Sequence, residues 1–352
     1  MASAASVIRA LDPEKYEAVP IGITKQGRWL VGTGAQKMLP EVLESGERVL
    51  LPPDPTSAVL IPLAPAAERV AVDVVFPVLH GTFGEDGTVQ GLLELAGLPY
   101  VGAGVLASSV GMDKDVQKRL FAEAGLPIVP FLAVRRSKWE ADRAKVIRQI
   151  KKKFKFPVFV KPATLGSSVG MARVNSAREL PAALDVAAEY ALKILVERSV
   201  TAREIEVSVL GNDDPRASMP GEIVPHREFY DYTAKYLEQG TRLVIPAPLS
   251  TKQVATFQDL AVRAFQAIDG AGMARCDFFL EKRTGKIFVN ELNTIPGFTS
   301  ISMYPKMWEA SGLPYSQLID RLIELALELH REKARTKYSI ELPPGVRGAL
   351  EA

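Results

Sequence analysis

Short apolar stretches alternate with amphipathic stretches over the first third of the chain. Strand-like apolar runs occupy Val19–Ile23, Val70–Leu79 and Leu98–Val101. Between them, Gly34–Glu44 has a helical or turn-like pattern, and Gly87–Ala96 has the spacing of an amphipathic helix. Alternation of strands and helices favours an α/β unit with a parallel sheet.

The pattern changes after a helix expected over Asp113–Ala124, whose apolar positions Val116, Leu120, Phe121 and Ala124 would share one face. Five strand-like runs with two helices among them follow, which is typical of an α+β unit. These runs are Ile128–Val134, Val158–Lys161, Gly170–Val174, Ile194–Glu197 and Ile205–Leu210.

The last third begins with a strand at Gly221 and a long polar and aromatic loop. A helix over Lys252–Ile268, a β-hairpin and an amphipathic helix over Tyr315–Leu329 come next. A chain of 352 residues is too long for one ordinary core. We therefore predict three domains, 1–112, 113–220 and 221–335, followed by a charged tail at 336–352.

The hairpin carries the clearest chemistry. Side chains two apart on a strand share a face, so Arg275 lies with Asp277 and Glu291 lies with Asn293. A turn centred on Thr284 would place Asp277 opposite Glu291 and Arg275 opposite Asn293. Carboxylate and amide oxygens suit Mg²⁺, and a guanidinium beside them would stabilise a developing anion. The alternative is a surface cluster of charges, which four polar groups on one face make less favoured.

Composition and charge exclude several classes of function. The residues are 47% hydrophobic and 24% charged, as in globular proteins, and the net charge of +2 gives no strong field for nucleic acid or a membrane surface. The single Cys276 excludes an internal disulfide and fits a reducing compartment. Without a signal peptide or a long apolar span, the expected location is cytoplasmic.

A second candidate site follows the strand that ends near Lys161. The loop Gly166–Gly170 is rich in glycine and serine, so its backbone N–H groups could approach phosphate oxygens, with Lys161 and Lys114 adding charge. An ordinary hairpin is the alternative. The loop also matches the Gly-x-Ser-x-Gly pattern of hydrolases, with Ser168 as nucleophile, but strand-like sequence follows where that motif needs a helix.

Three further segments are candidates for ligand contacts. The polar loop from His80 to Gly87 follows a strand, where α/β sheets bind ligands, although it could be a plain connection. Glu197 and Glu204 lie near strand ends and could bind an adenine amino group and ribose hydroxyls. The loop containing Lys235 and Tyr236 could act as a lid. The glycines at 102 and 104 resemble a dinucleotide-binding fingerprint. The helical pattern begins only near Asp113, however, so we read these glycines as a turn.

Taken in order, these motifs resemble the D-alanine–D-alanine ligase family of the ATP-grasp superfamily. The resemblance runs from about Val19 to Leu329. It rests on segments at 80–87, 112–114, 161–170, 230–236, 274–277 and 290–297. It implies a three-domain ATP-grasp architecture, ATP-dependent joining of two D-alanines through an acyl phosphate, a homodimer, and a place in peptidoglycan precursor synthesis.

The resemblance also implies a role for each site residue. Asp277, Glu291 and Asn293 would bind two Mg²⁺ ions, with Mn²⁺ as an alternative, and Arg275 and Gly297 would stabilise the oxyanion. The other implied contacts fall into two sets. ATP would be bound by Lys114, Lys161, Ser168, Glu197, Glu204, Lys235 and Phe279, and the amino acids by Ser167, Tyr236, His80, Ser302 and Met303.

One departure from the family pattern lies at the start of the chain. Family members begin with a strand and a turn bearing a glutamate that binds the ammonium of the first substrate. Here Met1–Arg9 reads as the helix that should follow that turn, so we expect the first strand of the N-terminal sheet to be missing. The alternatives are a nucleotide-binding relative with impaired catalysis, or a ligase that accepts D-lactate.

Overall fold

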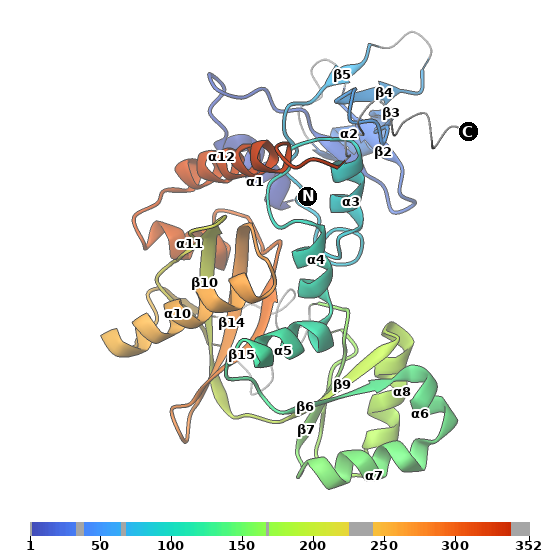
Figure 1. Ribbon diagram of the computed structural model, residues 1–352, viewed down its shortest axis with the longest axis vertical. Coiled ribbons are helices and arrows are strands. Elements are labelled where there is room, and N and C mark those ends of the chain that lie inside the picture. The colour runs from blue at the N-terminus through green and yellow to red at the C-terminus, as the bar shows by residue number, and fades with distance from the viewer. Residues whose placement is uncertain (1, 33–38, 65–67, 167–168, 225–241, 339–352) are drawn as a thin grey trace, which may run out of the picture.

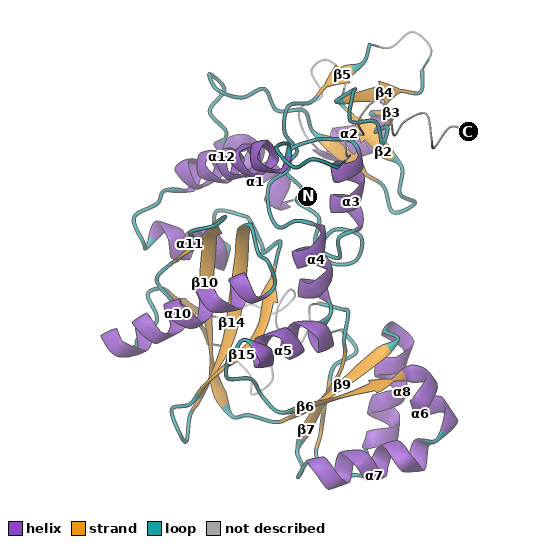
Figure 2. Cartoon of the chain, in the orientation of Figure 1, coloured by secondary structure: helices purple, strands orange, loops and turns teal. Residues whose placement is uncertain are grey.

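The computed structural model describes residues 2–32, 39–64, 68–166, 169–224 and 242–338 (Figure 1). Its strands form three separate sheets, and the pairs within each sheet are antiparallel (Figure 2). None of the helices in these ranges is long and apolar enough to cross a membrane.

The N-terminal sheet has the order β1-β2-β3-β4-β5, so consecutive strands are neighbours. The prediction of a parallel sheet is wrong for these strands, because all four pairs are antiparallel. The elements are α1 (Ala2–Ala10), β1 (Ile21–Ile23), β2 (Trp29–Val31), α2 (Leu39–Ser45), β3 (Glu47–Leu50), β4 (Val59–Pro62), β5 (Val70–Ala71), α3 (Thr88–Leu95) and α4 (Val105–Met112).

The strand predicted over Val70–Leu79 is regular only at Val70–Ala71. A single parallel bridge then joins Val75 to Tyr100, and it is all that remains of the strand predicted over Leu98–Val101. Pro77 and Pro99 lie beside this bridge and have no backbone N–H to extend a ladder, which explains why the apolar run packs without forming a longer strand.

The central sheet has the order β6-β9-β7-β8, and its helices α6, α7 and α8 lie together beside it (Figure 1). Trp139, Ile150 and Leu184 from these helices are buried against Val160 and Val196 of the strands. The elements are α5 (Lys114–Glu123), β6 (Phe131–Arg135), α6 (Arg136–Ala141), α7 (Arg143–Lys153), β7 (Val158–Pro162), β8 (Ala172–Val174), α8 (Leu180–Tyr190) and β9 (Lys193–Arg198).

Helix α5 begins and ends where the sequence indicated, but its buried face is different. Of the four apolar residues predicted to share the inner face, only Phe121 is buried, whereas Leu120 and Ala124 are exposed. The buried positions are mainly polar and include Gln117 and Lys118. The helix therefore presents hydrogen-bonding and charged groups to the interior, between the central and C-terminal sheets (Figure 1).

The C-terminal sheet has the order β13-β12-β10-β14-β15, with β11 paired to β10. Strand β10 joins this sheet although it precedes the domain boundary predicted near residue 220. The elements are β10 (Ala202–Gly211), β11 (Arg216–Ala217), β12 (Gly221–Val224), β13 (Arg242–Val244), α10 (Thr251–Ala267), β14 (Gly272–Glu281), β15 (Ile287–Asn293), α11 (Met303–Glu309) and α12 (Tyr315–Lys333).

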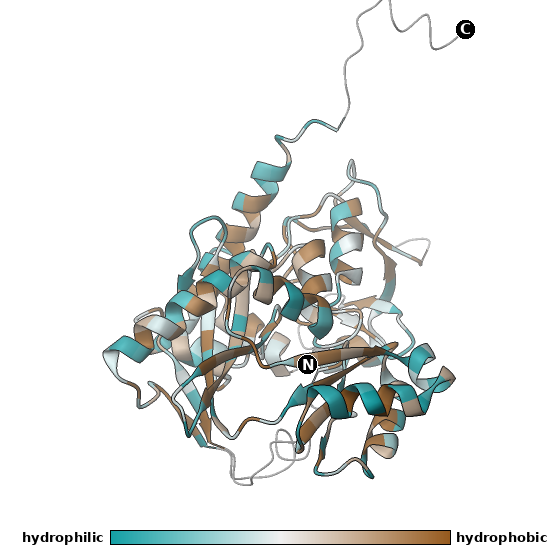
Figure 3. Cartoon of the chain, turned by 60° about the horizontal axis from the view of Figure 1, so that its bottom comes forward, coloured by the Kyte–Doolittle hydropathy of each residue, from teal (hydrophilic) through white to brown (hydrophobic). Residues whose placement is uncertain are grey.

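Strand β14 separates an apolar face from a polar one. Ala274, Cys276 and Phe278 are buried against α10, where Phe257 and Phe265 complete the core. Coloured by hydropathy, strands and helices both carry brown and teal stretches (Figure 3). The opposite face of β14 is left for the candidate site.

Candidate functional site

The β14–β15 hairpin has the register that the sequence predicted. Arg275 lies opposite Asn293, and Asp277 lies opposite Glu291. The ladder shifts between Asp277 and Phe278, so beyond the polar pairs the register differs by one residue. This bulge changes the direction of the strand next to the two carboxylates, a common device near active sites.

Arg275 is the centre of the polar face of the hairpin. Its Nε donates to Asp277 Oδ1 at 2.7 Å, and its Nη2 donates to Asp277 Oδ2 at 2.8 Å. Glu206 on β10 contacts the same nitrogen, with Oε2 3.1 Å from Nε. Asn293 Nδ2 donates to Asp277 Oδ2 at 3.0 Å. Burial opposes the charge of Arg275, but Asp277 and Glu206 outweigh it and hold its pKa above the ordinary value.

Lys114 joins this hairpin to the central sheet. Its Nζ is 3.3 Å from Glu291 Oε2 and donates to the carbonyl of Leu165 at 2.9 Å. Its backbone N–H donates to Ala163, just after β7. Asp113 caps the helix, accepting from two backbone N–H groups of the first turn. The first turn of α5 therefore joins Glu291 to the segment just before the predicted phosphate loop.

Glu197 lies between two lysines in the interior. Lys161 Nζ is 2.9 Å from its Oε2, and Lys118 Nζ is 3.2 Å from its Oε1. Burial disfavours the carboxylate, but the two lysines outweigh that effect and the pKa of Glu197 lies below its usual value. Burial lowers the pKa of Lys118, with Glu197 opposing the shift. The cluster has two cations for one anion, which favours a further anionic ligand.

The loop after Leu79 meets the segment that follows β15. His80 Nδ1 is 3.0 Å from the carbonyl oxygen of Ile295. Glu85 accepts hydrogen bonds from the backbone N–H of Gly81 at 2.6 Å and of Ile295 at 3.3 Å. Burial raises the pKa of Glu85 despite these bonds. His80 Nε2 also lies 3.5 Å from Ser3 Oγ, so α1 reaches the same region.

Gly297 and Ser302 lie close together beyond β15. A Cβ at Gly297 would come within 3.3 Å of Ser302 Oγ, so a side chain there would crowd the site. Ser302 Oγ accepts from the backbone N–H of Thr299 at 3.0 Å. The side chain of Met303 packs in an apolar cluster with Ile223 and Met307.

The remaining predicted residues divide into two groups. Phe279 is half-buried on the face of Arg275 and Asp277, directly opposite Glu204 on β10, so these two predicted nucleotide contacts are neighbours. The other group, Ser167, Ser168, Lys235 and Tyr236, lies outside the described residues. The hydrolase alternative finds no support in the flanking elements, since strand β8, and not a helix, follows the loop.

Sequence reasoning missed several buried polar residues around the site. Glu206 shares a face with Glu204, and the two alternate with the apolar Ile205 and Val207, which was the available signal. Lys118 lies one helical turn after Lys114. Gln117 binds both the N–H and the carbonyl of Leu292, at 3.1 and 3.0 Å, between Glu291 and Asn293.

The helix over Val105–Met112 was also missed, since the helical signal was placed only from Asp113. Small residues let this helix approach β15 closely. A Cβ at Gly111 would meet Thr294 Cγ2 at 3.0 Å. The turn predicted at Gly102 and Gly104 therefore leads directly into a helix.

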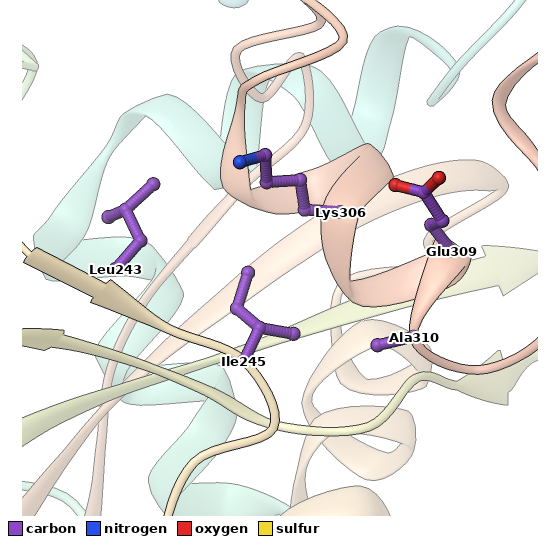
Figure 4. Close-up of a pocket in the computed structure, with 5 residues that line it drawn as sticks. All are labelled: Leu243, Ile245, Lys306, Glu309 and Ala310. Atoms are coloured by element: carbon purple, nitrogen blue, oxygen red, sulfur yellow. The ribbon is translucent and has the colours of Figure 1, made fainter.

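Two shallow hollows of about 370 Å³ each lie away from these residues. One is lined by Leu243, Ile245, Lys306, Glu309 and Ala310, between β13 and α11 (Figure 4). The other lies over Trp139, among charged residues of α6, α7 and α8. Neither contains a residue predicted for catalysis or binding.

Comparisons with known proteins agree over nearly the whole chain. The family profiles described as D-ala D-ala ligase N-terminus and C-terminus match residues 1–103 and 120–324. A D-alanine–D-alanine ligase of Heliobacterium modesticaldum is 52% identical over 337 residues, covering 95% of this chain and 92% of the relative. One from Bacillus cytotoxicus is 49% identical over 341 residues, covering 96% and 94%.

Solved structures show the same likeness. A D-alanine–D-alanine ligase from Coxiella burnetii superposes with a TM-score of 0.83 at 38% identity, covering 95% of this chain and 90% of that one. The VanG D-Ala:D-Ser ligase from Enterococcus faecalis gives a TM-score of 0.83 at 34% identity, covering 92% and 94%.

Proposed function

Since this chain belongs to the D-alanine–D-alanine ligase family, we propose that it joins two D-alanines into D-alanyl-D-alanine while ATP becomes ADP and phosphate. The observation that carries the proposal is the polar face of the β14–β15 hairpin. There two carboxylates and a guanidinium are linked through Lys114 to the loop that follows β7.

The side chains at this face fit a divalent cation. Asp277 and Glu291 lie opposite each other and supply hard oxygen donors, and each already faces a positive group, Arg275 or Lys114. Among the described residues no group of three or more His, Cys, Asp or Glu side chains could hold a metal. The two facing carboxylates suit Mg²⁺ or Mn²⁺, which would take its remaining ligands from phosphate, Asn293 and water. Bound there, the cation would neutralise charge on the transferred phosphoryl group.

The first half of the reaction is phosphoryl transfer. A carboxylate oxygen of the first D-alanine attacks the γ-phosphorus, the bond to ADP breaks, and an acyl phosphate forms. Lys114 and Lys161 bind phosphate oxygens, and Glu197 with Glu204 and Phe279 binds the nucleoside. The excess positive charge of the lysine cluster around Glu197 supports this assignment.

The second half is acyl transfer. The amine of the second D-alanine attacks the acyl carbon and loses a proton as the amide bond forms. The bond between the acyl carbon and the bridging phosphate oxygen breaks, and phosphate leaves with that oxygen. Arg275 and the Gly297 N–H stabilise the oxyanion of the tetrahedral intermediate. His80 contacts the first amino acid, with Ser167 and Tyr236 shaping the sites. Ser302 and the backbone at Met303 receive the second carboxylate.

The experiment that tests the function is phosphate release from Mg·ATP, measured with and without D-alanine. We expect release to require D-alanine, and D-serine or D-lactate to be poor second substrates. Phosphate release that does not require D-alanine would contradict the ligase proposal. The absence of any phosphate release would contradict it too. A relative with impaired catalysis and a D-lactate ligase are both less favoured, because the curated relatives carry the D-alanine–D-alanine ligase name.

Substitution of the carboxylates tests the site itself. Asp277→Ala and Glu291→Ala should each lower D-alanine-dependent phosphate release by roughly a hundredfold or more, because charge on the phosphoryl group is no longer neutralised. Asp259→Ala on the exposed face of α10 is the matched control and should retain activity. Near wild-type rates in both site variants would contradict the metal assignment.

A homodimer and a cytoplasmic location are further proposals from family likeness. Size-exclusion chromatography with light scattering would test the dimer. A mass near 38.3 kDa, that of one chain, would contradict it.

A further inference from the structure

Three carboxylates form a row across adjacent strands of the C-terminal sheet. Glu206 on β10 lies opposite Asp277 on β14, and Asp277 lies opposite Glu291 on β15. The outer two are not equivalent, because Glu291 faces Lys114 while Glu206 faces Arg275. Glu206 is buried and has no place in the chemistry described above.

The guanidinium of Arg275 is shared between two carboxylates of this row. Its Nε lies 2.7 Å from Asp277 Oδ1 and 3.1 Å from Glu206 Oε2. Both oxygens of Asp277 accept from Arg275, and Oδ2 also accepts from Asn293. Three of the roughly four lone-pair sites of Asp277 are therefore already used by these donors.

A cation at Asp277 must compete with Arg275 for the same oxygens. If Asp277 were the only partner of Arg275, turning toward the cation would leave a largely buried guanidinium without a counter-charge, which is costly. Glu206 is already in contact with the same Nε and can keep that charge compensated. It also holds the guanidinium over the sheet, where the oxyanion is proposed to form.

We infer that Glu206 is a positioning residue that retains Arg275 while Asp277 turns to the divalent cation. This role rests on the proposed function, since it assumes a cation at Asp277. It predicts that Glu206 controls metal affinity although it is not itself assigned as a ligand. Loss of one charge-assisted contact should weaken cation binding by roughly tenfold or more.

The test is a titration of the full-length protein with Mn²⁺ in the presence of a non-hydrolysable ATP analogue, followed by electron paramagnetic resonance. Glu206→Gln should raise the Kd for Mn²⁺ by roughly tenfold or more, and Glu206→Asp should recover part of the affinity because it keeps the charge. An affinity of Glu206→Gln equal to that of the wild type would overturn the inference.

Glu222→Gln is the matched control for the loss of a partly buried arginine–glutamate pair. Glu222 on β12 accepts two hydrogen bonds from Arg203 on β10, each 2.7 Å long. The pair lies in the same sheet as Glu206, and Glu222 lies opposite Ile205 in the strand register. The Glu222→Gln variant should have a lower melting temperature, as Glu206→Gln should, but its affinity for Mn²⁺ should be unchanged. If Glu206→Gln and Glu222→Gln weakened Mn²⁺ binding equally, Glu206 would contribute only to the stability of the fold, and the inference would be overturned. A wild-type protein that binds no Mn²⁺ would instead contradict the proposed function.

Discussion

Glu197 carries its negative charge in the interior because Lys118 and Lys161 flank it. Replacing it with Gln would leave a fully buried lysine facing an uncharged group. We expect Glu197→Gln to lower the free energy of unfolding by about 3–5 kcal/mol, as measured by urea denaturation. Glu324→Gln, which breaks an exposed pair with Arg321 on α12, should cost less than about 1 kcal/mol. Equal small effects would contradict a charged cluster.

The same residue predicts a pH dependence of stability. The pKa of Glu197 is lower in the folded protein than its ordinary value of 4.5, because the attraction of the two lysines exceeds the burial penalty. Its stabilising contribution is therefore complete above the unfolded pKa and is lost as pH falls through the folded pKa. The stability difference between the wild type and Glu197→Gln should shrink on acidification below about pH 4.5. A difference that is constant with pH would contradict this.

The sequence predicted individual residues well where the chemistry is local. Arg275 and Asn293 were placed opposite each other from strand alternation and a turn centre alone, and the register confirms it. Lys118 could not be found in the same way. Its burial depends on Glu197, which is 79 positions along the chain and on a different element, and a lone lysine on a helix otherwise indicates a solvated face.

At the scale of elements, Gln117 links α5 to the edge strand β15. Its amide accepts from the N–H of Leu292 and donates to the carbonyl of Leu292, as a neighbouring strand would, and it also donates to Gly111. The residues on either side of Leu292 are two of the three predicted metal ligands. The helix therefore fixes the strand at the point where those ligands project.

Gln117→Ala should consequently weaken both the fold and the site. Unpaired buried backbone groups cost about 1–3 kcal/mol each, so we expect a loss of at least about 2 kcal/mol in urea denaturation, with weaker Mn²⁺ binding. Gln258→Ala on α10 removes one bond to the Ser218 carbonyl and should cost less, with no change in Mn²⁺ affinity. Unchanged Mn²⁺ binding in Gln117→Ala would show that the edge strand holds its ligands unaided.

Helices, which depend on residues close together in the sequence, were predicted well. The pairing of strands that are far apart in the sequence was not. The helices over Lys114–Glu123 and Tyr315–Lys333 begin where expected, to within a residue. The N-terminal strands were assigned to a parallel sheet because alternation with helices favours it. Strands β1 to β5 instead pair antiparallel, and the bridge between Val75 and Tyr100 is parallel. The order of strands and helices along the sequence does not determine which strands pair or in which direction.

At the scale of the whole molecule, apolar clusters and polar contacts both join parts of the chain that are far apart in sequence. Phe121 of α5 packs with Ala274 and Leu292 of the C-terminal sheet. Helix α5 sits between the central and C-terminal sheets (Figure 1), and its Lys114 touches both the loop after β7 and Glu291 of β15. Domain interfaces that bury a ligand are often incomplete without it. Nucleotide and cation should therefore act as part of the structure that holds the two sheets together.

Ligand-linked stability tests this arrangement. A ligand that binds only the folded state at a hundred times its Kd adds about 2.7 kcal/mol, so a non-hydrolysable ATP analogue with Mg²⁺ should raise the melting temperature by several degrees. The analogue without Mg²⁺ should raise it less, because the carboxylates of Asp277 and Glu291 would then face the phosphates without an intervening cation. In Asp277→Ala the added effect of Mg²⁺ should disappear, while stabilisation by the analogue alone persists through Lys114 and Lys161. If Mg²⁺ stabilised that variant as strongly as the wild type, the cation would have to bind away from the hairpin, and the polar face of β14 would serve only to place Arg275.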